Sequence, residues 1–119
     1  MMDIRIDPES ATPPYEQVRL RIAALAADGT LPAGAKLPPV RTLAADLDLA
    51  ANTVARAYRE LEAAGLVETR GRGGTVITAR ASGTSVQAQL AAESYAATTR
   101  ALGVPPETAL ALVKAALAL

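Results

Sequence analysis

The first half of the chain contains three segments in which apolar residues recur every three or four positions, the spacing that places them on one face of an α-helix. The first begins at Pro13 and stops at Gly29, since proline is favoured at the start of a helix and glycine just past its end. Two further segments, at 40–47 and 51–64, follow the turn-rich stretch "TLPAGAKLPP". The positions predicted to be buried on these helices are Tyr15, Val18, Ile22, Leu25, Leu43, Ala44, Leu47, Val54, Ala57, Tyr58 and Leu61.

Two short β-prone runs, at 66–69 and 75–78, come next and are joined by "RGRGG". They predict a β-hairpin. Only a few residues separate the second and third helices, as in a helix-turn-helix pair, so the order of elements is that of a winged helix-turn-helix. Before the first helix, Ile4 and Ile6 alternate with charged residues and predict a short strand or an extended arm that ends at Pro8.

The last third of the chain is helical and apolar. After "ARASGTS", which we interpret as a linker, helices are predicted at 86–102 and 107–119. Lys114 is the only charged residue after Glu107, and a helix that is apolar on most sides is normally buried. Because few residues remain here to bury it, we expect a second subunit to do so. The predicted contacts are Leu90, Leu110, Val113 and Leu117.

The fold class is therefore predicted to be mainly α with a small β-hairpin. Residues 1–80 are expected to form a winged helix-turn-helix domain with an N-terminal arm, and residues 81–119 a two-helix dimerisation tail. At 119 residues the chain is long enough for one domain with such an appendage.

Charge is balanced overall but distributed unevenly. Lys and Arg together number 12, as do Asp and Glu, so the chain has no net charge and is no bulk polycation. From residue 69 to residue 92, however, the only charged residues are Arg70, Arg72 and Arg80. The hairpin is therefore a local basic patch.

The residue types that are missing exclude several classes of function. The chain has no Cys and no His, which removes the usual nucleophiles and bases, disulfides and nearly every zinc, copper or haem site, so we expect no metal and no cofactor. An enzyme would depend on scattered carboxylates or on Lys36 and Lys114. No signal-like segment and no apolar run of about 18 residues is present, so we expect a cytoplasmic protein.

The second helix of a helix-turn-helix enters the major groove, and its N-terminal residues meet the base edges. In this chain those residues are 50–56. Asn52 can pair with adenine, Arg56 with guanine or a phosphate, and Thr53 with a phosphate. Arg41 lies at the start of the preceding helix, where a cation is unfavourable for the helix dipole. That position indicates an anionic partner outside the chain.

Each of these residues also has a plainer explanation. Asn52 is a good helix N-cap, Arg56 and Arg59 are spaced for surface pairs with Glu60 and Glu62, and the hairpin glycines suit the turn itself. The DNA-binding explanation is favoured because the cations occur on the three elements that a winged helix presents to one duplex.

The motifs resemble a known family. They are "GTLPAGAKLP" at 29–38, "VRTLA" at 40–44, "NTVARAYRELEAAGL" at 52–66 and the hairpin "RGRGGT". Residues 13–78 resemble the DNA-binding domain of GntR-type bacterial transcription regulators. The short two-helix tail resembles that of the YtrA-type branch, in which this region serves dimerisation. The chain departs from the family pattern at Pro39, where serine is usual, at Asp48, where glycine is common, and in an extra hairpin glycine.

The resemblance implies a set of DNA contacts. In the recognition unit, the contacts are Arg41, Asn52, Thr53 and Arg56. In the wing, which the family places in the minor groove, they are Arg70, Gly71 and Arg72. Lys36 and Arg59 are weaker candidates for phosphate contacts.

We therefore expect a sequence-specific transcriptional regulator, acting as a repressor, that binds an inverted-repeat operator in double-stranded DNA as a homodimer. A small-molecule effector of unknown identity between the C-terminal helices of two subunits is compatible with this function, although no polar cluster marks a site there. The alternative is a winged helix used only for protein–protein interaction, and an enzyme is not expected.

Overall fold

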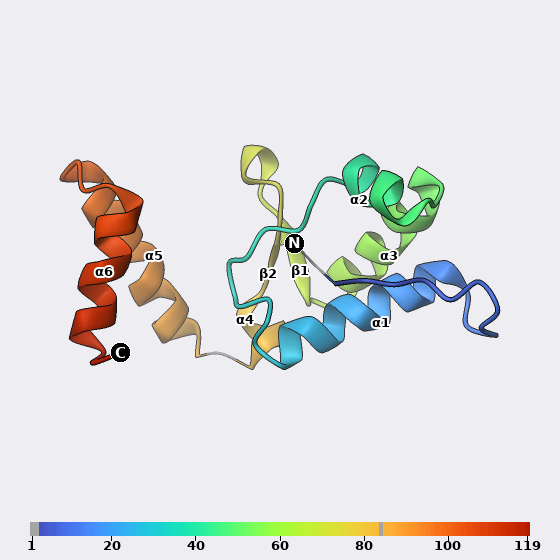
Figure 1. Cartoon of the computed structure of the whole chain (residues 1–119), viewed down its shortest axis with the longest axis horizontal. Helices are drawn as coiled ribbons and strands as arrows, with labels where there is room; N and C mark the ends of the chain where they lie inside the picture. The colour runs from blue at the N-terminus through green and yellow to red at the C-terminus, as the bar shows by residue number, and fades with distance from the viewer. Residues whose placement is uncertain (1–2, 84) are drawn as a thin grey trace. The chain divides into compact units, whose positions relative to one another are not determined.

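The computed structural model describes residues 3–83 and 85–119 (Figure 1); residues 1, 2 and 84, which fall in the predicted arm and linker, lie outside the described residues. The chain divides into two compact units, Met1–Thr84 and Ser85–Leu119. None of the helices in the described parts of the chain is long and apolar enough to cross a membrane.

The first unit contains the three predicted helices, α1 (Pro14–Ala27), α2 (Val40–Leu47) and α3 (Ala51–Ala63). Proline occupies the first position of α1, where its missing N–H costs nothing, and the chain turns away at Asp28 and Gly29. The predicted inward positions are buried, apart from Tyr15 and Leu47, which are half-buried. The largest fully buried side chains are Ile22, Leu61, Ile77, Val18, Val54 and Val67, so the core lies where α1, α3 and the sheet meet.

Asp48 forms the turn between α2 and α3. Its φ of 56° and ψ of 47° lie in the left-handed region, which glycine adopts freely and aspartate tolerates better than most residues. The turn at this position therefore has the backbone of a glycine turn although its residue is aspartate.

The predicted hairpin consists of β1 (Val67–Thr69) and β2 (Thr75–Ile77), paired antiparallel with Val67 opposite Ile77. The connector before α2, predicted only as turns, extends this sheet. The Gly34 N–H donates to the Ile77 carbonyl at 2.8 Å, and the Leu37 N–H donates to the Thr75 carbonyl at 2.8 Å. The connector thereby fixes the start of α2 beside the hairpin.

The predicted linker is wrong in its first part, because residues 79–82 form the short helix α4 (Ala79–Ser82). Thr78 caps it: its hydroxyl accepts the Ala81 N–H at 3.3 Å and donates to the Gly65 carbonyl at 2.7 Å. The N-terminal segment is an extended arm without strand pairing, and the side chain of Gln17 on α1 bonds to the backbone of Asp7.

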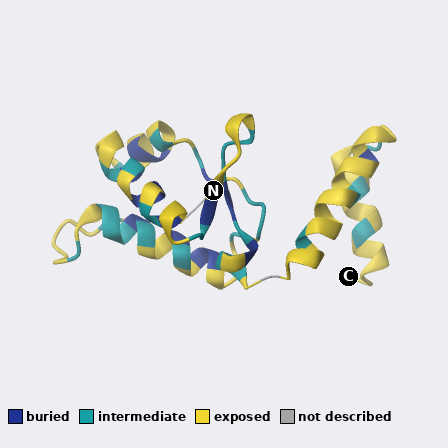
Figure 2. Ribbon diagram, turned by 180° about the vertical axis from the view of Figure 1, so that it is seen from behind, coloured by how far each residue is buried: buried dark blue, intermediate teal, exposed yellow. Residues whose placement is uncertain are grey.

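The second unit is a pair of helices, α5 (Val86–Ala101) and α6 (Pro106–Ala116), with most side chains exposed (Figure 2). The Tyr95 hydroxyl donates to the Ala109 carbonyl at 2.8 Å and joins the two helices. Thr99 is the single buried residue of this unit among those the structure describes. The exposed large apolar side chains of the second unit are Val86, Leu90, Leu102, Leu110, Leu112, Leu117 and Leu119.

Tyr58 connects α3 to the loop that enters α2. Its buried hydroxyl donates to the Pro38 carbonyl at 2.7 Å, and burial raises the pKa of the phenol. Tyr58→Phe will lower the free energy of unfolding by about 1–2 kcal/mol, because the carbonyl is left without its donor. Urea unfolding followed by circular dichroism measures this.

Tyr15→Phe is the matched control: the Tyr15 hydroxyl makes no hydrogen bond to the described residues, so stability should not change. Equal stability of the Tyr58→Phe variant and the wild type would contradict the assignment.

Candidate nucleic-acid interface

Most of the predicted DNA contacts lie on three elements of the first unit, namely the start of α2, α3 and the hairpin tip, while Lys36 lies on the connector before α2. Figure 1 shows the hairpin tip and the α2–α3 pair on one side of this unit, with α1 on the other. Arg41 is the second residue of α2 and is exposed. Neither α2 nor α3 has a side-chain cap at its N-terminus. The Thr53 N–H donates to the Ala50 carbonyl at 3.0 Å, and the other backbone N–H groups of the two first turns remain available to an anion.

Asn52 is not the N-cap of α3. That position is occupied by Ala50, while Asn52 is the second residue inside the helix and is exposed. Its side-chain amide makes no hydrogen bond to any residue of 3–83 or 85–119. The capping explanation is therefore wrong, and the amide is available for an external partner. Thr53, beside it, is half-buried.

A hollow of about 200 Å³ separates α3 from the hairpin. Ala55 and Arg59 line it from α3, and Thr69 and Thr75 line it from the strands. The carboxylate of Glu62, also in its wall, accepts the Thr69 N–H at 3.2 Å and so ties the hairpin to α3. The expected surface pair between Arg59 and Glu62 is not formed within the described chain. Arg59 thus lies on the side of α3 that faces the hairpin.

Arg56 lies on another flank of α3, toward α1. Its guanidinium carbon is 3.7 Å from the centroid of the Tyr15 ring, and its Nε donates to Glu60 at 3.1 Å. The predicted helix-surface pair is therefore present. Close by, Arg19 donates to the Glu16 carboxylate, which holds the pKa of Glu16 below its usual value, and the charge of Arg56 acts in the same direction. The contact between Tyr15 of α1 and Arg56 of α3 was not predicted from the sequence, where Tyr15 was assigned only to the buried face of its helix.

The hairpin tip is a single turn of 3-10 helix, Gly71–Gly73. Gly71 and Gly74 have φ of 53° and 74°, which favour glycine, and with ψ of −158° the backbone of Gly74 is open to almost no other residue. Arg70 lies at the base of the tip and is bound to Glu68, with Nη2 2.6 Å from Oε1. Arg72 lies within the turn and is exposed. The two predicted wing cations therefore differ, since only Arg72 carries an uncompensated charge at the tip.

Lys36 belongs to the connector that pairs with β2, and its backbone bridges to Val76. The side chain is exposed beside the hairpin. Within residues 3–83 and 85–119, four cations of this surface have no hydrogen-bond or ion-pair partner: Lys36, Arg41, Arg59 and Arg72. The same part of the chain contains no group of three or more acidic side chains suited to a metal ion.

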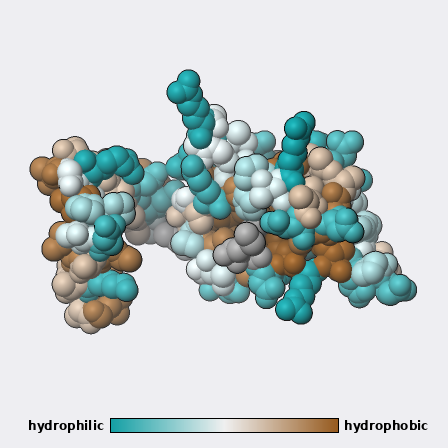
Figure 3. All heavy atoms as spheres, turned by 45° about the horizontal axis from the view of Figure 1, so that its top comes forward, coloured by the Kyte–Doolittle hydropathy of each residue, from teal (hydrophilic) through white to brown (hydrophobic). Residues whose placement is uncertain are grey.

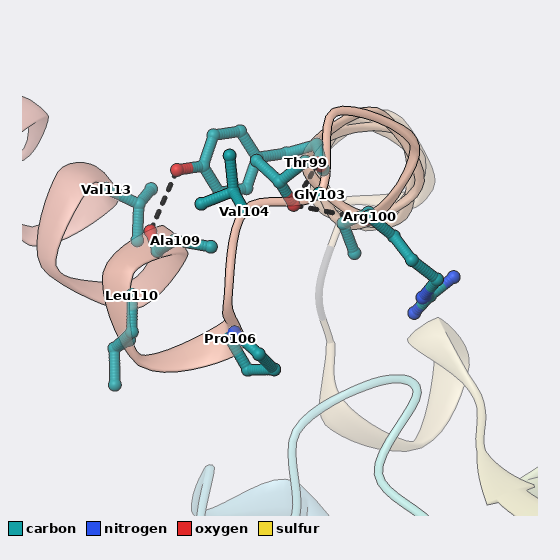
Figure 4. A pocket seen from close by; sticks show the side chains of 10 residues that line it. Thr99, Arg100, Gly103, Val104, Pro106, Ala109, Leu110 and Val113 are labelled. Atoms are coloured by element: carbon teal, nitrogen blue, oxygen red, sulfur yellow. Dashed lines mark hydrogen bonds between the residues drawn. The ribbon is translucent and has the colours of Figure 1, made fainter.

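A larger hollow, of about 490 Å³, lies within the second unit between α5 and α6 (Figure 4). Leu110 and Val113 are in its wall, while the other two predicted dimer contacts, Leu90 and Leu117, are not. Its hydroxyl groups are already engaged, because Tyr95 donates to Ala109 and Thr99 donates to the Tyr95 and Ala96 carbonyls. The hollow is therefore mainly apolar, with the side chain of Arg100 at its edge.

Comparison with known proteins places this arrangement among transcription regulators. Residues 14–77 match the family described as "Bacterial regulatory proteins, gntR family". The HTH-type transcriptional regulator Rv1152 of Mycobacterium tuberculosis is 46% identical over 107 residues, which cover 90% of this chain and 88% of that protein. The HTH-type transcriptional repressor YtrA of Bacillus subtilis is 46% identical over 88 residues, 73% of this chain and 67% of that protein.

Solved structures agree. YtrA from Sulfolobus acidocaldarius, a GntR-family transcription factor, superimposes with a TM-score of 0.61 and 35% identity over 81% of this chain and 97% of that one. The DNA-binding domain of AraR, solved in complex with operator ORX1, gives a TM-score of 0.55 and 25% identity over 61% of this chain and 90% of that one. The predicted winged-helix fold and family are confirmed.

Proposed function

The chain belongs to the GntR family of bacterial regulatory proteins, and we propose that it is a cytoplasmic transcriptional repressor that binds an inverted-repeat operator as a homodimer. It acts by occupying DNA and not by catalysis.

The cations without internal partners carry the DNA-binding part of the proposal. Arg41, Arg59 and Arg72 come from α2, α3 and the hairpin, and the exposed Asn52 amide lies among them. Cations contribute affinity through the phosphates, and an amide at the start of the recognition helix contributes base choice. The resemblance to AraR, whose DNA-binding domain was solved in complex with operator ORX1, supports DNA as the partner.

The exposed leucines of the second unit support a homodimer. Leu90, Leu110 and Leu117 are 58%, 54% and 64% exposed in the single chain. Figure 3 shows hydrophobic residues at the surface of the α5–α6 pair. Soluble monomers rarely leave contiguous apolar surface of this kind uncovered, and a two-fold pair of these units would bury it. A two-fold dimer presents two recognition helices, which explains the inverted repeat.

Repression rests on the relatives, since the similar protein of Bacillus subtilis is named a transcriptional repressor. A small effector in the hollow between α5 and α6 would meet a mainly apolar wall, with the guanidinium of Arg100 at its edge.

Replacing Arg41 and Arg72 together by alanine will test the DNA-binding part. Each phosphate contact that is lost lowers the slope of log K against log salt by about 0.9, so a dimer that loses four should lose about 3–4 in slope. Fluorescence anisotropy with an operator selected from random duplexes, at several salt concentrations, measures the slope. Arg80→Ala removes an exposed cation from α4 and serves as the control, with an unchanged slope expected. An unchanged slope in the double variant would remove these two residues from the interface.

A further inference from the structure

Tyr15 and Arg56 bring the start of α1 into contact with the recognition helix. The ring lies under the guanidinium at 3.7 Å, inside the range in which a cation and an aromatic face attract. Glu60, one turn further along α3, holds the Nε of the same arginine. Two different elements therefore determine where this guanidinium lies.

The contact leaves part of Arg56 available. Its side chain is 55% exposed, and a guanidinium that stacks by its face keeps its N–H donors at the edge. Nε is engaged with Glu60, so the terminal Nη groups are the ones that remain. A guanidinium that is held this way has less freedom to lose when it binds an external group.

The direction of Arg56 determines what it can meet. Adjacent residues of an α-helix point about 100° apart, and Ala55 faces the hairpin while Arg56 faces α1. A helix that lies in a groove has bases in front of it and a phosphate strand along each flank. Arg56 follows Asn52 by four residues, which turns it about 40° around the helix from Asn52 toward α1, and so toward the phosphate strand on that side.

We propose that Tyr15 is a positioning residue for DNA binding: its ring, with Glu60, holds the Arg56 guanidinium so that the Nη groups bind a backbone phosphate beside the recognition helix. This inference rests on the proposed function. It assigns Arg56 to a phosphate and not to a base, and it gives the half-buried Tyr15 a role beyond packing.

The charges around the contact are compatible with an incoming anion. Two cations and two acids meet at this junction: Arg19, Arg56, Glu16 and Glu60. The carboxylate of Glu16 is already bound to Arg19. Glu60 engages the Nε edge only. A phosphate that approaches the Nη groups of Arg56 would therefore meet a cation that is hydrogen-bonded to one acid, Glu60, and not to Glu16 as well.

The test is a double-mutant cycle on operator binding, with Tyr15→Leu, Tyr15→Phe, Arg56→Gln and the Tyr15→Leu, Arg56→Gln double variant. Tyr15→Leu keeps an apolar side chain but removes the aromatic face. We expect about a tenfold loss of affinity for the dimer and a salt slope lower by about two, one phosphate per protomer. Tyr15→Phe keeps the aromatic face and should bind like the wild type. In the Arg56→Gln background, Tyr15→Leu should have no further effect.

Arg56→Lys provides a second route that leaves Tyr15 intact. Lysine keeps the charge but has neither the planar group that stacks on the ring nor a pair of Nη groups for the phosphate, so we expect a loss of affinity similar to that of Tyr15→Leu with a smaller change in salt slope. Thermal melting of each variant establishes that it is folded. The inference is overturned if Arg56→Lys or Tyr15→Leu binds like the wild type, or if Tyr15→Leu weakens binding equally with and without Arg56.

The wild type separates this inference from the function on which it rests. Selective, salt-sensitive binding by the wild type with an unchanged Tyr15→Leu variant would overturn the positioning role alone. A wild type without selective binding would overturn both.

Discussion

Leu110→Asp will convert the protein from a dimer to a monomer at micromolar concentration. Leu110 lies on α6 and is 54% exposed in the single chain, so an aspartate there is solvated in the monomer and does not disturb its fold. In the proposed dimer the same carboxylate would be buried without a partner in each subunit. An uncompensated buried charge costs about 3–5 kcal/mol, so the dimer dissociation constant should rise by about two orders of magnitude or more. Sedimentation velocity over a concentration series measures it.

Thr108→Asp is the matched control for this substitution. It places the same charge in the same helix, at an exposed polar position. The control should remain a dimer and bind the operator normally, while the Leu110→Asp protein should lose most of its operator affinity because the two half-sites no longer act together. An unchanged dimer in the Leu110→Asp variant would show that α6 is not the contact.

Ala51→Glu will lower operator affinity by about 100-fold or more while the protein stays folded. Ala51 is the first residue of α3 and is exposed, and the first turn of this helix contains no acid. A carboxylate there is favourable for the helix dipole by about 0.3–1 kcal/mol, so stability should be equal or slightly higher. Against the phosphates it is repulsive, and like-charge contacts across an interface cost several kcal/mol. We expect affinity to fall by about 100-fold or more, as measured by fluorescence anisotropy.

Ala51→Gln separates charge from size in this experiment. Glutamine has nearly the same shape as glutamate and no charge, so its loss of affinity should stay below about tenfold, given that most of the effect is electrostatic. If the glutamate variant binds like the wild type, the start of α3 does not face the duplex. If both variants fail equally, the position is limited by space and not by charge.

The helices and hairpin of the first unit were predictable because the spacing of apolar residues along the chain follows which side chains are buried. Val18, Val54 and Leu61 recur at helical spacing and are all fully buried, since one short core receives the inner face of each helix. The beginning and end of α1 were also predictable, because proline and glycine act through local backbone geometry.

Features that depend on distant parts of the chain were not predictable in this way. The connector bonds to β2 through backbone groups of Gly34 and Leu37, and backbone pairing leaves no side-chain pattern in so short a stretch. The α4 turn was missed although its signals were present, a capping Thr78 before it and Gly83 after it, because small residues show no periodicity.

The candidate site was predictable as a set of elements and less so as a set of atoms. Sequence spacing placed Arg56 and Arg59 on the same helix, but only packing separates them, one stacked on Tyr15 and the other facing the hairpin. In the same way, Arg70 and Arg72 are adjacent cations in the sequence, and only the structure shows that Glu68 engages the first. The individual DNA contacts and the dimer contacts remain predictions.

In the proposed dimer, two-fold symmetry places two copies of α3 in the major groove of an inverted repeat. Hydroxyl-radical footprinting on an operator selected from random duplexes tests it most directly. We predict two protected patches, related by two-fold symmetry and about one helical turn apart, that disappear together in the Leu110→Asp protein at the same concentration. A single asymmetric patch, or two patches that persist at full strength in that variant, would contradict the account.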